Sequence, residues 1–280
     1  MAVVRAHHPG DDPRSPEASE RLLVLETTFL NTMAKADPTM HRSVVVCNGR
    51  PLPALASLCR GAGVELVVRE NRSMDFGAYS AGVRHIDTAG IDAWVFVNDS
   101  SAGPLHPKNA AAPFAELLEL LDEGADLAGQ SINPMVPRPT DTRGPLPHVQ
   151  TMSFAMTARG MAELRQNFLS VREDEDIPYE RLVSDHEIAM STYALQEGLA
   201  IDCLLPPLRG IDWKRISVDW LRLLAPNRTW GGDPWNAGAW YGRTLLPSET
   251  LLYKYNRVTS LDWETELGRR VAQAQAQADI

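Results

Sequence analysis

Short apolar runs alternate with helical patterns along most of this chain. Apolar side chains recur every three or four positions over residues 17–35, which predicts a helix there. Runs rich in β-branched residues predict strands at residues 42–49, 64–68 and 93–97, with 42–49 as the first strand of a sheet. Helical patterns follow at residues 53–60, 76–85 and 114–121. This alternation at short intervals is what parallel βαβ units require.

The second half of the chain continues the alternation around a proline-rich loop. Strands are expected at residues 126–132, 149–156 and 200–206, and helices at residues 158–168 and 184–197. Residues 133–147 contain five prolines, so this stretch is stiff and non-helical. A loop of that length inside a domain is usually functional or disordered.

The aromatic residues are concentrated near the carboxyl end. Five of the seven tryptophans fall between residues 213 and 240, among Gly, Pro and Asn: Trp213, Trp220, Trp230, Trp235 and Trp240. They either anchor an irregular segment to the sheet or stack on a sugar ring. We expect a flexible leader at residues 1–16, one domain over 17–262 with a donor half at about 43–135 and an acceptor half at about 146–262, and a frayed tail at 263–280.

Composition narrows the class of protein. The chain has 280 residues, of which 44% are hydrophobic and 22% charged, so it can bury a sizeable core. Its net charge of −9 argues against a nucleic-acid partner, which needs a basic surface. A nucleotide remains a plausible ligand, because a diphosphate needs only a local group of donors or a cation.

Cysteine usage and hydropathy indicate a cytoplasmic location. Cys47, Cys59 and Cys203 are widely spaced and lack metal-ligand spacing, so we expect buried, reduced thiols. Residues 1–20 are polar and rich in proline, unlike a signal peptide. No run approaches the roughly 20 apolar residues that span a bilayer, so a lipid-linked substrate would require peripheral contact with the inner face of the membrane.

Two polar clusters follow predicted strands directly. Residues 71–75 come after the strand at 64–68, and residues 98–100 come after the strand at 93–97. Ligands of open α/β sheets bind outside the carboxyl ends of the strands, so both clusters should converge on one crevice. The pattern predicts a nucleotide site there.

The segments ENRSMDFGAY and VFVNDSSAGP resemble the bacterial glycosyltransferases related to rhamnan synthesis protein F. This resemblance covers residues 44–257 as scattered motifs. It implies a GT-A-like α/β fold and a nucleoside diphosphate-sugar donor. It also identifies Asn98, Asp99 and Ser100 as the triplet that meets the donor's ribose, its diphosphate and a divalent metal, Mg²⁺ or Mn²⁺. Only Asp99 of this triplet is acidic, in contrast to the Asp-any-Asp pattern, so Asp99 is the candidate metal ligand.

The first cluster supplies further donor-site candidates. Asn71 and Asp75 carry polar groups suited to ribose or base, and Gly77 permits a close backbone approach. Alternatively, Ser73 or Asp75 caps the helix that starts near residue 76. The NDS segment followed by Ser-Ala-Gly-Pro is also a good turn sequence.

Candidates for the acceptor side lie later in the chain. His148 and Gln150 match a His-any-Gln pattern associated with the same family, although a lone His beside a strand is as often structural. HEIAMSTYALQEG is similar to the segment of inverting transferases in which the second acid of a pair removes the acceptor proton. This similarity assigns Glu187 as the catalytic base, with Asp185 as the nearby alternative. The competing interpretation is a capping box formed by Ser184 and Glu187.

The segment LLPSETLLYKYNR resembles the closing segment of the family, where Lys254 and Arg257 would stabilise the leaving diphosphate, unless they form an ordinary solvated face. The sequence therefore predicts a metal-assisted, inverting glycosyltransferase that acts on a saccharide or glycolipid acceptor in bacterial surface polysaccharide synthesis. A non-catalytic nucleotide- or carbohydrate-binding protein of the same fold is the alternative. A dinucleotide-dependent oxidoreductase is disfavoured, because no G-x-G-x-x-G follows the strand at 42–49.

Overall fold

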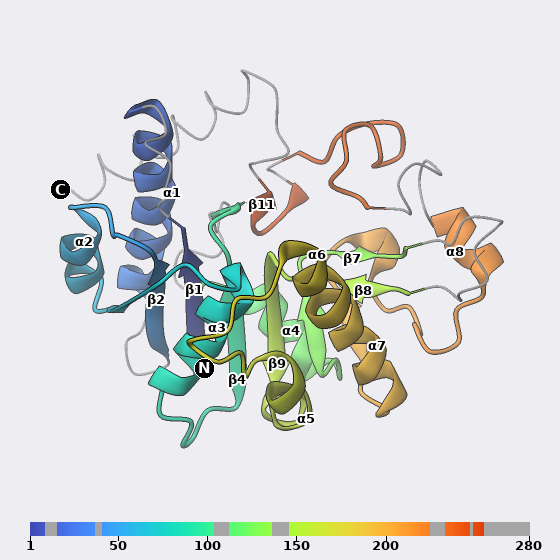
Figure 1. Ribbon diagram of the computed structural model, residues 1–280. Coiled ribbons are helices and arrows are strands. Elements are labelled where there is room, and N and C mark those ends of the chain that lie inside the picture. The colour runs from blue at the N-terminus through green and yellow to red at the C-terminus, as the bar shows by residue number, and fades with distance from the viewer. Residues whose placement is uncertain are drawn as a thin grey trace.

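The computed structural model describes residues 1–8, 16–36, 41–103, 112–135, 146–224, 233–246 and 249–254. Its centre is a seven-stranded sheet (Figure 1). Across the sheet the strands are β10 (Ile201–Cys203), β6 (Leu127–Gly129), β9 (Ser153–Thr157), β4 (Ala93–Val97), β1 (Ala2–His7), β2 (Arg42–Asn48) and β3 (Glu65–Arg69). β9 runs antiparallel to both of its neighbours, and the other strands run in one direction.

Helices cover both faces of this sheet. Alternate residues of β1 pack into different cores: Val3 lies with Phe29 and Leu117, whereas Val4 lies with Tyr79 and Leu164. The first core is covered by α1 (Pro16–Lys35), α2 (Leu55–Gly61) and α4 (Ala115–Asp122), and the second by α3 (Met74–His85), α5 (Ala158–Phe168) and α7 (Ala189–Gln196). The predicted fold class, a mostly parallel α/β sheet flanked by helices, is confirmed.

The expected leader is wrong over residues 2–7, which form β1, an interior strand of the sheet. This strand pairs in parallel with β2 on one side and β4 on the other, so residues 42–49 hold the second strand of the chain. Arg5 and His7 made the segment look polar, yet both side chains are fully buried. Arg5 is tolerated there because Nη2 donates to Oε1 of Glu26 at 2.7 Å and because its guanidinium lies over the Phe29 ring.

Most other predicted elements agree with the structure to within a few residues, and three are divided. The segment 126–132 contains β6 and then β7 (Ile132–Asn133), which pairs with β8 (His148–Val149). The strand expected at 149–156 is therefore split between β8 and β9. The helix expected at 184–197 begins earlier, with α6 (Tyr179–Arg181) and a π-helical segment η2 (Leu182–Ile188) before α7.

The carboxyl-terminal part adds small elements around the sheet. A 3-10 turn η3 (Pro206–Leu208) and helix α8 (Val218–Leu224) precede β11 (Tyr253–Lys254), which pairs antiparallel with β5 (Ser101–Ala102) (Figure 1). Residues 255–280, which include Arg257 and the predicted tail, lie outside the described residues. The division into one domain with two halves stays a prediction.

The tryptophans of this region mainly anchor it. Trp213, Trp235 and Trp240 are at most 4% exposed, whereas Trp220 is 61% exposed, and Trp230 lies outside the described residues. The three cysteines are buried and unpaired, as expected. Within the described residues, no helix combines the length and apolar character needed to cross a membrane.

Candidate active site

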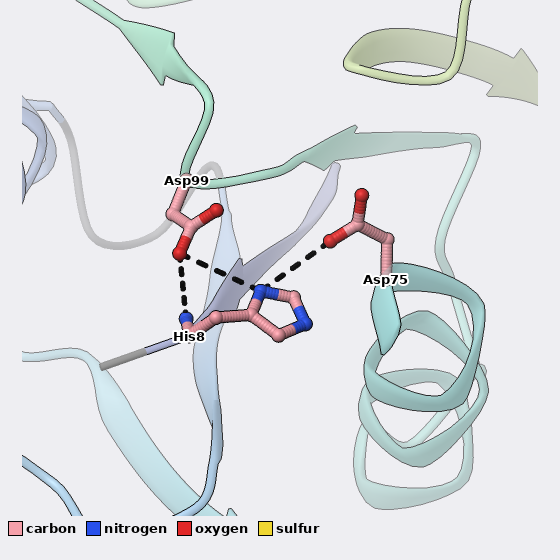
Figure 2. Close-up of side chains that lie close together, drawn as sticks. All are labelled: His8, Asp75 and Asp99. Atoms are coloured by element: carbon pink, nitrogen blue, oxygen red, sulfur yellow. Dashed lines mark hydrogen bonds and ion pairs between the residues drawn. The ribbon is translucent and has the colours of Figure 1, made fainter. Parts of the chain in front are cut away.

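His8, Asp75 and Asp99 lie together at the carboxyl-terminal edge of the sheet (Figure 2). His8 follows β1, Asp75 is in the first turn of α3, and Asp99 follows β4. The main-chain N–H of His8 donates to Oδ2 of Asp99 at 2.7 Å. Nδ1 of the same residue lies 3.5 Å from Oδ1 of Asp75 and 3.5 Å from Oδ2 of Asp99. Segments far apart in the sequence therefore form one partly buried cluster.

The two carboxylates differ in their electrostatic environment. Burial raises the pKa of Asp75, and the charge of Asp99 adds to this effect. Burial alone would also raise the pKa of Asp99, but the hydrogen bond and the charge of His8 lower it below its ordinary value. For His8, burial disfavours the charged form, yet the two acids outweigh it and raise the pKa to about 9. Asp99 is thus the more strongly ionised member of the cluster.

The NDS segment, residues 98–100, forms a turn and also contributes side chains to this site. Oδ1 of Asn98 accepts hydrogen bonds from the main-chain N–H of Ser100 at 3.1 Å and from its hydroxyl at 2.6 Å. Nδ2 of Asn98 donates to Oδ2 of Asp75 at 2.7 Å. The predicted convergence of the two polar clusters is therefore confirmed at this contact.

Arg5 holds the main chain of the turn at residues 98–101 in place. Its Nη1 donates to the main-chain oxygen of Asn98 at 2.8 Å and to that of Ser101 at 3.1 Å. Asp99 lies between these two carbonyl groups in the sequence, so the buried Arg5–Glu26 pair fixes the backbone that carries Asp99.

The start of α3 follows a different pattern from the expected cap. Ser73 is the N-cap residue, with φ of 55°, but its side chain makes no capping bond. Its hydroxyl donates to the main-chain oxygen of Glu175 and accepts from the N–H of Ile177, both at 2.9 Å. Asp75 points to His8 and Asn98. The capping interpretation is therefore wrong for both residues.

Gly77 allows a close approach, but the approaching group belongs to the chain itself. A Cβ atom at this position would lie 2.2 Å from the main-chain oxygen of Arg72 and 2.7 Å from Nη1 of Arg69. Gly77 thus shapes the loop before α3. Asn71 lies exposed in that loop, and contact of Asn71 or Gly77 with a donor stays a prediction.

Lys254 reaches the same edge through β11. Its register partner in β5 is Ser101, which directly follows the NDS turn. A segment that lies some 150 positions later in the sequence therefore pairs with Ser101, two residues after Asp99, while Arg257 lies outside the described residues.

Glu187 does not form the capping box. Ser184 and Glu187 both lie inside η2, and Ser184 Oγ donates to Oδ1 of Asp185 at 2.7 Å. Oε2 of Glu187 accepts from the N–H of Thr151 at 3.2 Å and also from the Thr151 hydroxyl. The Glu187 charge also acts on the Asp75 carboxyl, whose pKa it helps to raise. Glu187 therefore faces the same edge of the sheet as the cluster.

Three predicted site residues remain: one lies beside Glu187, one is buried, and one lies towards the surface. His148 is 3% exposed, and its Nε2 lies 3.7 Å from Oε1 of Glu187. Gln150 is buried, accepts from Ser131 Oγ at 2.8 Å and donates to Asp233 at 3.2 Å. Asp185 is instead partly exposed and paired with Arg181. The geometry brings His148 to Glu187 and leaves Asp185 on the outer side of η2.

Sequence reasoning missed three residues of the site: His8, Arg5 and Thr151. The signal for Arg5 was Glu26, an acid next to Leu25 on the apolar stripe of α1, since a buried acid requires a buried cation. His8 carried no comparable signal, because its partner Asp99 is 91 positions away in the sequence. Thr151 carried no local signal, because its partner is 36 positions away in the sequence.

The cluster has the dimensions of a cation site. One ligand atom from each of His8, Asp75 and Asp99 lies within 4.8 Å of the others, so the group can hold a metal ion. The two carboxylates suit a hard divalent cation, which takes one or two carboxylates together with substrate phosphates and water. When bound, such an ion would neutralise charge on a diphosphate.

No family model matches the sequence, and no curated protein matches it. Solved structures do match. A CMP:2-keto-3-deoxy-manno-octonic acid synthetase complexed with CTP aligns over 72% of this chain and 88% of its own, with 11% identity and a TM-score of 0.40. A cytidylyltransferase from Leptospira borgpetersenii aligns over 71% of this chain and 73% of its own, with 15% identity and a TM-score of 0.40.

A third similar structure is the glycosyltransferase GlyE of Streptococcus pneumoniae, at 12% identity and a TM-score of 0.39. The alignment covers 71% of this chain and 44% of that protein, so this chain spans less than half of its length. Likeness at this level carries no argument about activity. The fold assignment therefore rests on the order and direction of the strands.

Proposed function

We propose that this protein is a metal-assisted, inverting glycosyltransferase of GT-A-like fold and of the rhamnan synthesis protein F-like group. It would transfer a sugar from a nucleoside diphosphate donor to a saccharide or lipid-linked acceptor of a bacterial surface polysaccharide, in the cytoplasm or at the inner face of the membrane. The observation that carries the proposal is that a two-carboxylate cluster lies at one edge of the sheet and that a separately held carboxylate, Glu187, is near enough for its charge to raise the pKa of Asp75.

The donor would bind against Asp75, Asn98 and Asp99. These residues follow strands at the edge where α/β sheets bind nucleotides. The Asp75 and Asp99 carboxylates would hold Mg²⁺ or Mn²⁺ against the diphosphate. Ser100 and Asn71 would offer neutral hydrogen bonds, and Lys254 would add positive charge where the leaving diphosphate becomes more negative.

The acceptor would be activated by Glu187. A transfer to a hydroxyl group needs one base to take the proton as the new bond to the sugar forms. Oε2 of Glu187 already accepts two hydrogen bonds from Thr151, so the side chain is held in one orientation. Oε1, on the side of His148, has lone pairs to accept the acceptor's proton. His148 and Gln150 would then orient the acceptor next to this oxygen.

The first test identifies the donor by thermal denaturation. Nucleoside diphosphates and their sugars are screened with Mn²⁺ and with EDTA, since a ligand that binds only the folded state raises the melting temperature. We expect one nucleotide class to stabilise the protein, and more strongly with Mn²⁺. The sugar nucleotide that binds is then incubated with the protein and candidate acceptor saccharides, and release of the nucleoside diphosphate is measured.

The outcomes separate the functions. Acceptor-dependent release that is lost in Glu187→Gln supports transfer. Stabilisation without release under any acceptor condition would favour the alternative, a non-catalytic nucleotide-binding protein. Failure of every nucleotide to stabilise the protein would overturn the donor site itself.

A further inference from the structure

Met74, the residue before Asp75, combines two features that are each unfavourable for an apolar residue. Its φ is 43°, in the left-handed region that a long side chain rarely adopts, and the φ of Ser73 before it is 55°. Its side chain is also 42% exposed, although Met is usually among the buried residue types. Backbone outliers of this kind cluster at ligand-binding sites, which makes Met74 a candidate for a binding role.

Side chains at the ends of two strands hold the Met74 backbone in this conformation. Nδ2 of Asn48, the last residue of β2, donates to the main-chain oxygen of Met74 at 2.8 Å. Oδ1 of Asn48 accepts from Nη1 of Arg69, the last residue of β3, at 2.7 Å. The same Nη1 donates to the main-chain oxygen of Arg72 at 2.9 Å. Strained backbone persists only where the surrounding structure fixes it, and these contacts fix it here.

The order of the strands places Met74 relative to the rest of the site. Side by side in the sheet are β9, β4, β1 and β2. Glu187 is held by the segment that precedes β9, Asp99 follows β4, His8 follows β1, and Asn48 ends β2. The residues that hold Glu187 and Met74 therefore lie on opposite sides of Asp99 and His8.

This arrangement gives a bound donor one direction along the edge of the sheet. The diphosphate would lie at Asp75 and Asp99, and the sugar carbon that is attacked must lie on the side of Glu187. The nucleoside is attached to the other end of the diphosphate, so it extends away from Glu187. We propose that Met74 is a donor-binding residue whose exposed side chain packs against the face of the nucleobase. This inference rests on the proposed function, which supplies the positions of the diphosphate and the base.

The chemistry of a methionine side chain suits this ligand. A nucleobase is a planar ring with two faces of low polarity, and a thioether sulfur makes favourable contacts with aromatic rings. The unbranched side chain adapts to rings of different size. Binding would also remove the exposed apolar surface of Met74 from water. The contact would therefore add affinity for purine and pyrimidine nucleotides alike.

Calorimetric titration in the presence of Mg²⁺ compares two kinds of probe. UDP, CDP, GDP, ADP and dTDP carry a base, whereas inorganic pyrophosphate carries only the diphosphate. Met74→Gly should bind the nucleoside diphosphate that binds wild type about 5- to 10-fold more weakly, because the apolar contact is lost. Its affinity for pyrophosphate should equal that of wild type. Met74→Leu keeps an apolar side chain of similar volume and should stay within about twofold of wild type for both probes.

Melting temperatures separate this contact from a structural role. Glycine adopts a φ of 43° without steric cost, and asparagine tolerates it, so Met74→Gly and Met74→Asn should melt no lower than wild type. A residue kept only for packing predicts the reverse, a lower melting temperature with unchanged affinity. Met74→Asn replaces Met74→Gly in the titrations if the glycine variant does not fold.

Val68→Ala is the matched control, because Val68 is another exposed apolar residue near the end of a strand. It is 53% exposed, and it lies on the other face of the sheet from α3, since its neighbour Val67 packs with the core that α3 covers. Its affinity for both probes should equal that of wild type.

The outcomes distinguish the contact from the donor site itself. Equal losses of affinity for the nucleoside diphosphate and for pyrophosphate would show that Met74 acts only through the backbone of Asp75. Unchanged affinity in Met74→Gly and Met74→Asn would show that the side chain makes no contact. Either result overturns this inference and leaves the proposed function standing. If wild type binds none of the nucleoside diphosphates, the donor site is overturned and this inference with it.

Discussion

Thr151 holds Glu187 through two donors that meet the same carboxylate oxygen, its main-chain N–H and its hydroxyl. The two residues come from different layers: Thr151 precedes β9, and Glu187 lies in η2. A second contact holds Thr151 itself, because the Tyr79 hydroxyl donates to its main-chain oxygen at 2.9 Å. The carboxylate of Glu187 is thereby positioned by the sheet and by α3, rather than by the end of its own helix.

This contact predicts that replacing the Glu187 carboxylate lowers the catalytic rate more than it lowers the stability of the fold. Glu187→Gln keeps the size of the side chain but cannot act as a base, so turnover should fall about 10²- to 10⁴-fold. Binding of the nucleoside diphosphate should be unchanged. Steady-state rates and calorimetry on the same samples measure both. Asp185→Asn is the control, and loss of turnover in that variant with normal turnover in Glu187→Gln would move the base to Asp185.

The Arg5–Glu26 pair predicts a pH-dependent stability. Burial alone would raise the pKa of Glu26, but the charge of Arg5 and the hydrogen bonds of Arg5 and His7 hold it below the ordinary value of 4.5. A depressed pKa contributes stability above the unfolded value, and this contribution is lost as the pH falls through the folded value. Glu26→Gln should cost about 3–5 kcal/mol at neutral pH, because it leaves Arg5 buried without its counter-charge.

Urea unfolding of both proteins at neutral and acidic pH checks this expectation. The advantage of wild type over Glu26→Gln should shrink as the pH falls below about 4.5. An advantage that is equally large at every pH would show that the pair is not the source of the stability.

Gly77 predicts a steric effect at the loop before α3. The Cβ of Gly77→Ala would meet the Arg72 carbonyl at 2.2 Å, so backbone must shift. We expect a loss of roughly 1–3 kcal/mol in unfolding free energy. Gly61 in α2 is the matched control, since a Cβ there meets nothing within 4 Å. The melting temperatures of the two variants are compared. Equal melting temperatures would mean that the chain relieves the Gly77 contact without losing stability.

Lys254 predicts an electrostatic effect on donor affinity. Removing its charge in Lys254→Gln retains the main-chain pairing of β11 with β5. Affinity for a nucleoside diphosphate should fall by about tenfold, or ~1.4 kcal/mol. Lys35→Gln is the control, because Lys35 ends α1 before β2 begins and so lies at the opposite edge of the sheet. Equal affinities in both variants would show that β11 has a structural role only.

The sequence predicted the elements that have strong local patterns and the edge at which their polar ends meet. Asp75 and Asn98 could be brought together in advance because parallel strands end at one edge. β1 could not be recognised, because Arg5 and His7 interrupt its apolar run and their shared charge partner, Glu26, lies 21 positions away from Arg5. The contact of Glu187 could not be predicted either. Local spacing suggested a cap, because its partner in the structure, Thr151, is distant in the sequence.

The most direct test of the donor site is calorimetric titration of the protein with a nucleoside diphosphate in the presence of Mg²⁺. Wild type, Asp99→Asn and Asp75→Asn are compared, with Asp185→Asn as a control of similar chemistry on the outer side of η2. The proposed site predicts saturable binding to wild type and to Asp185→Asn, and affinity at least about tenfold lower in the two cluster variants, since each loses one carboxylate of the site. Equal affinity in all four proteins, or no binding of any nucleoside diphosphate to wild type, would contradict it.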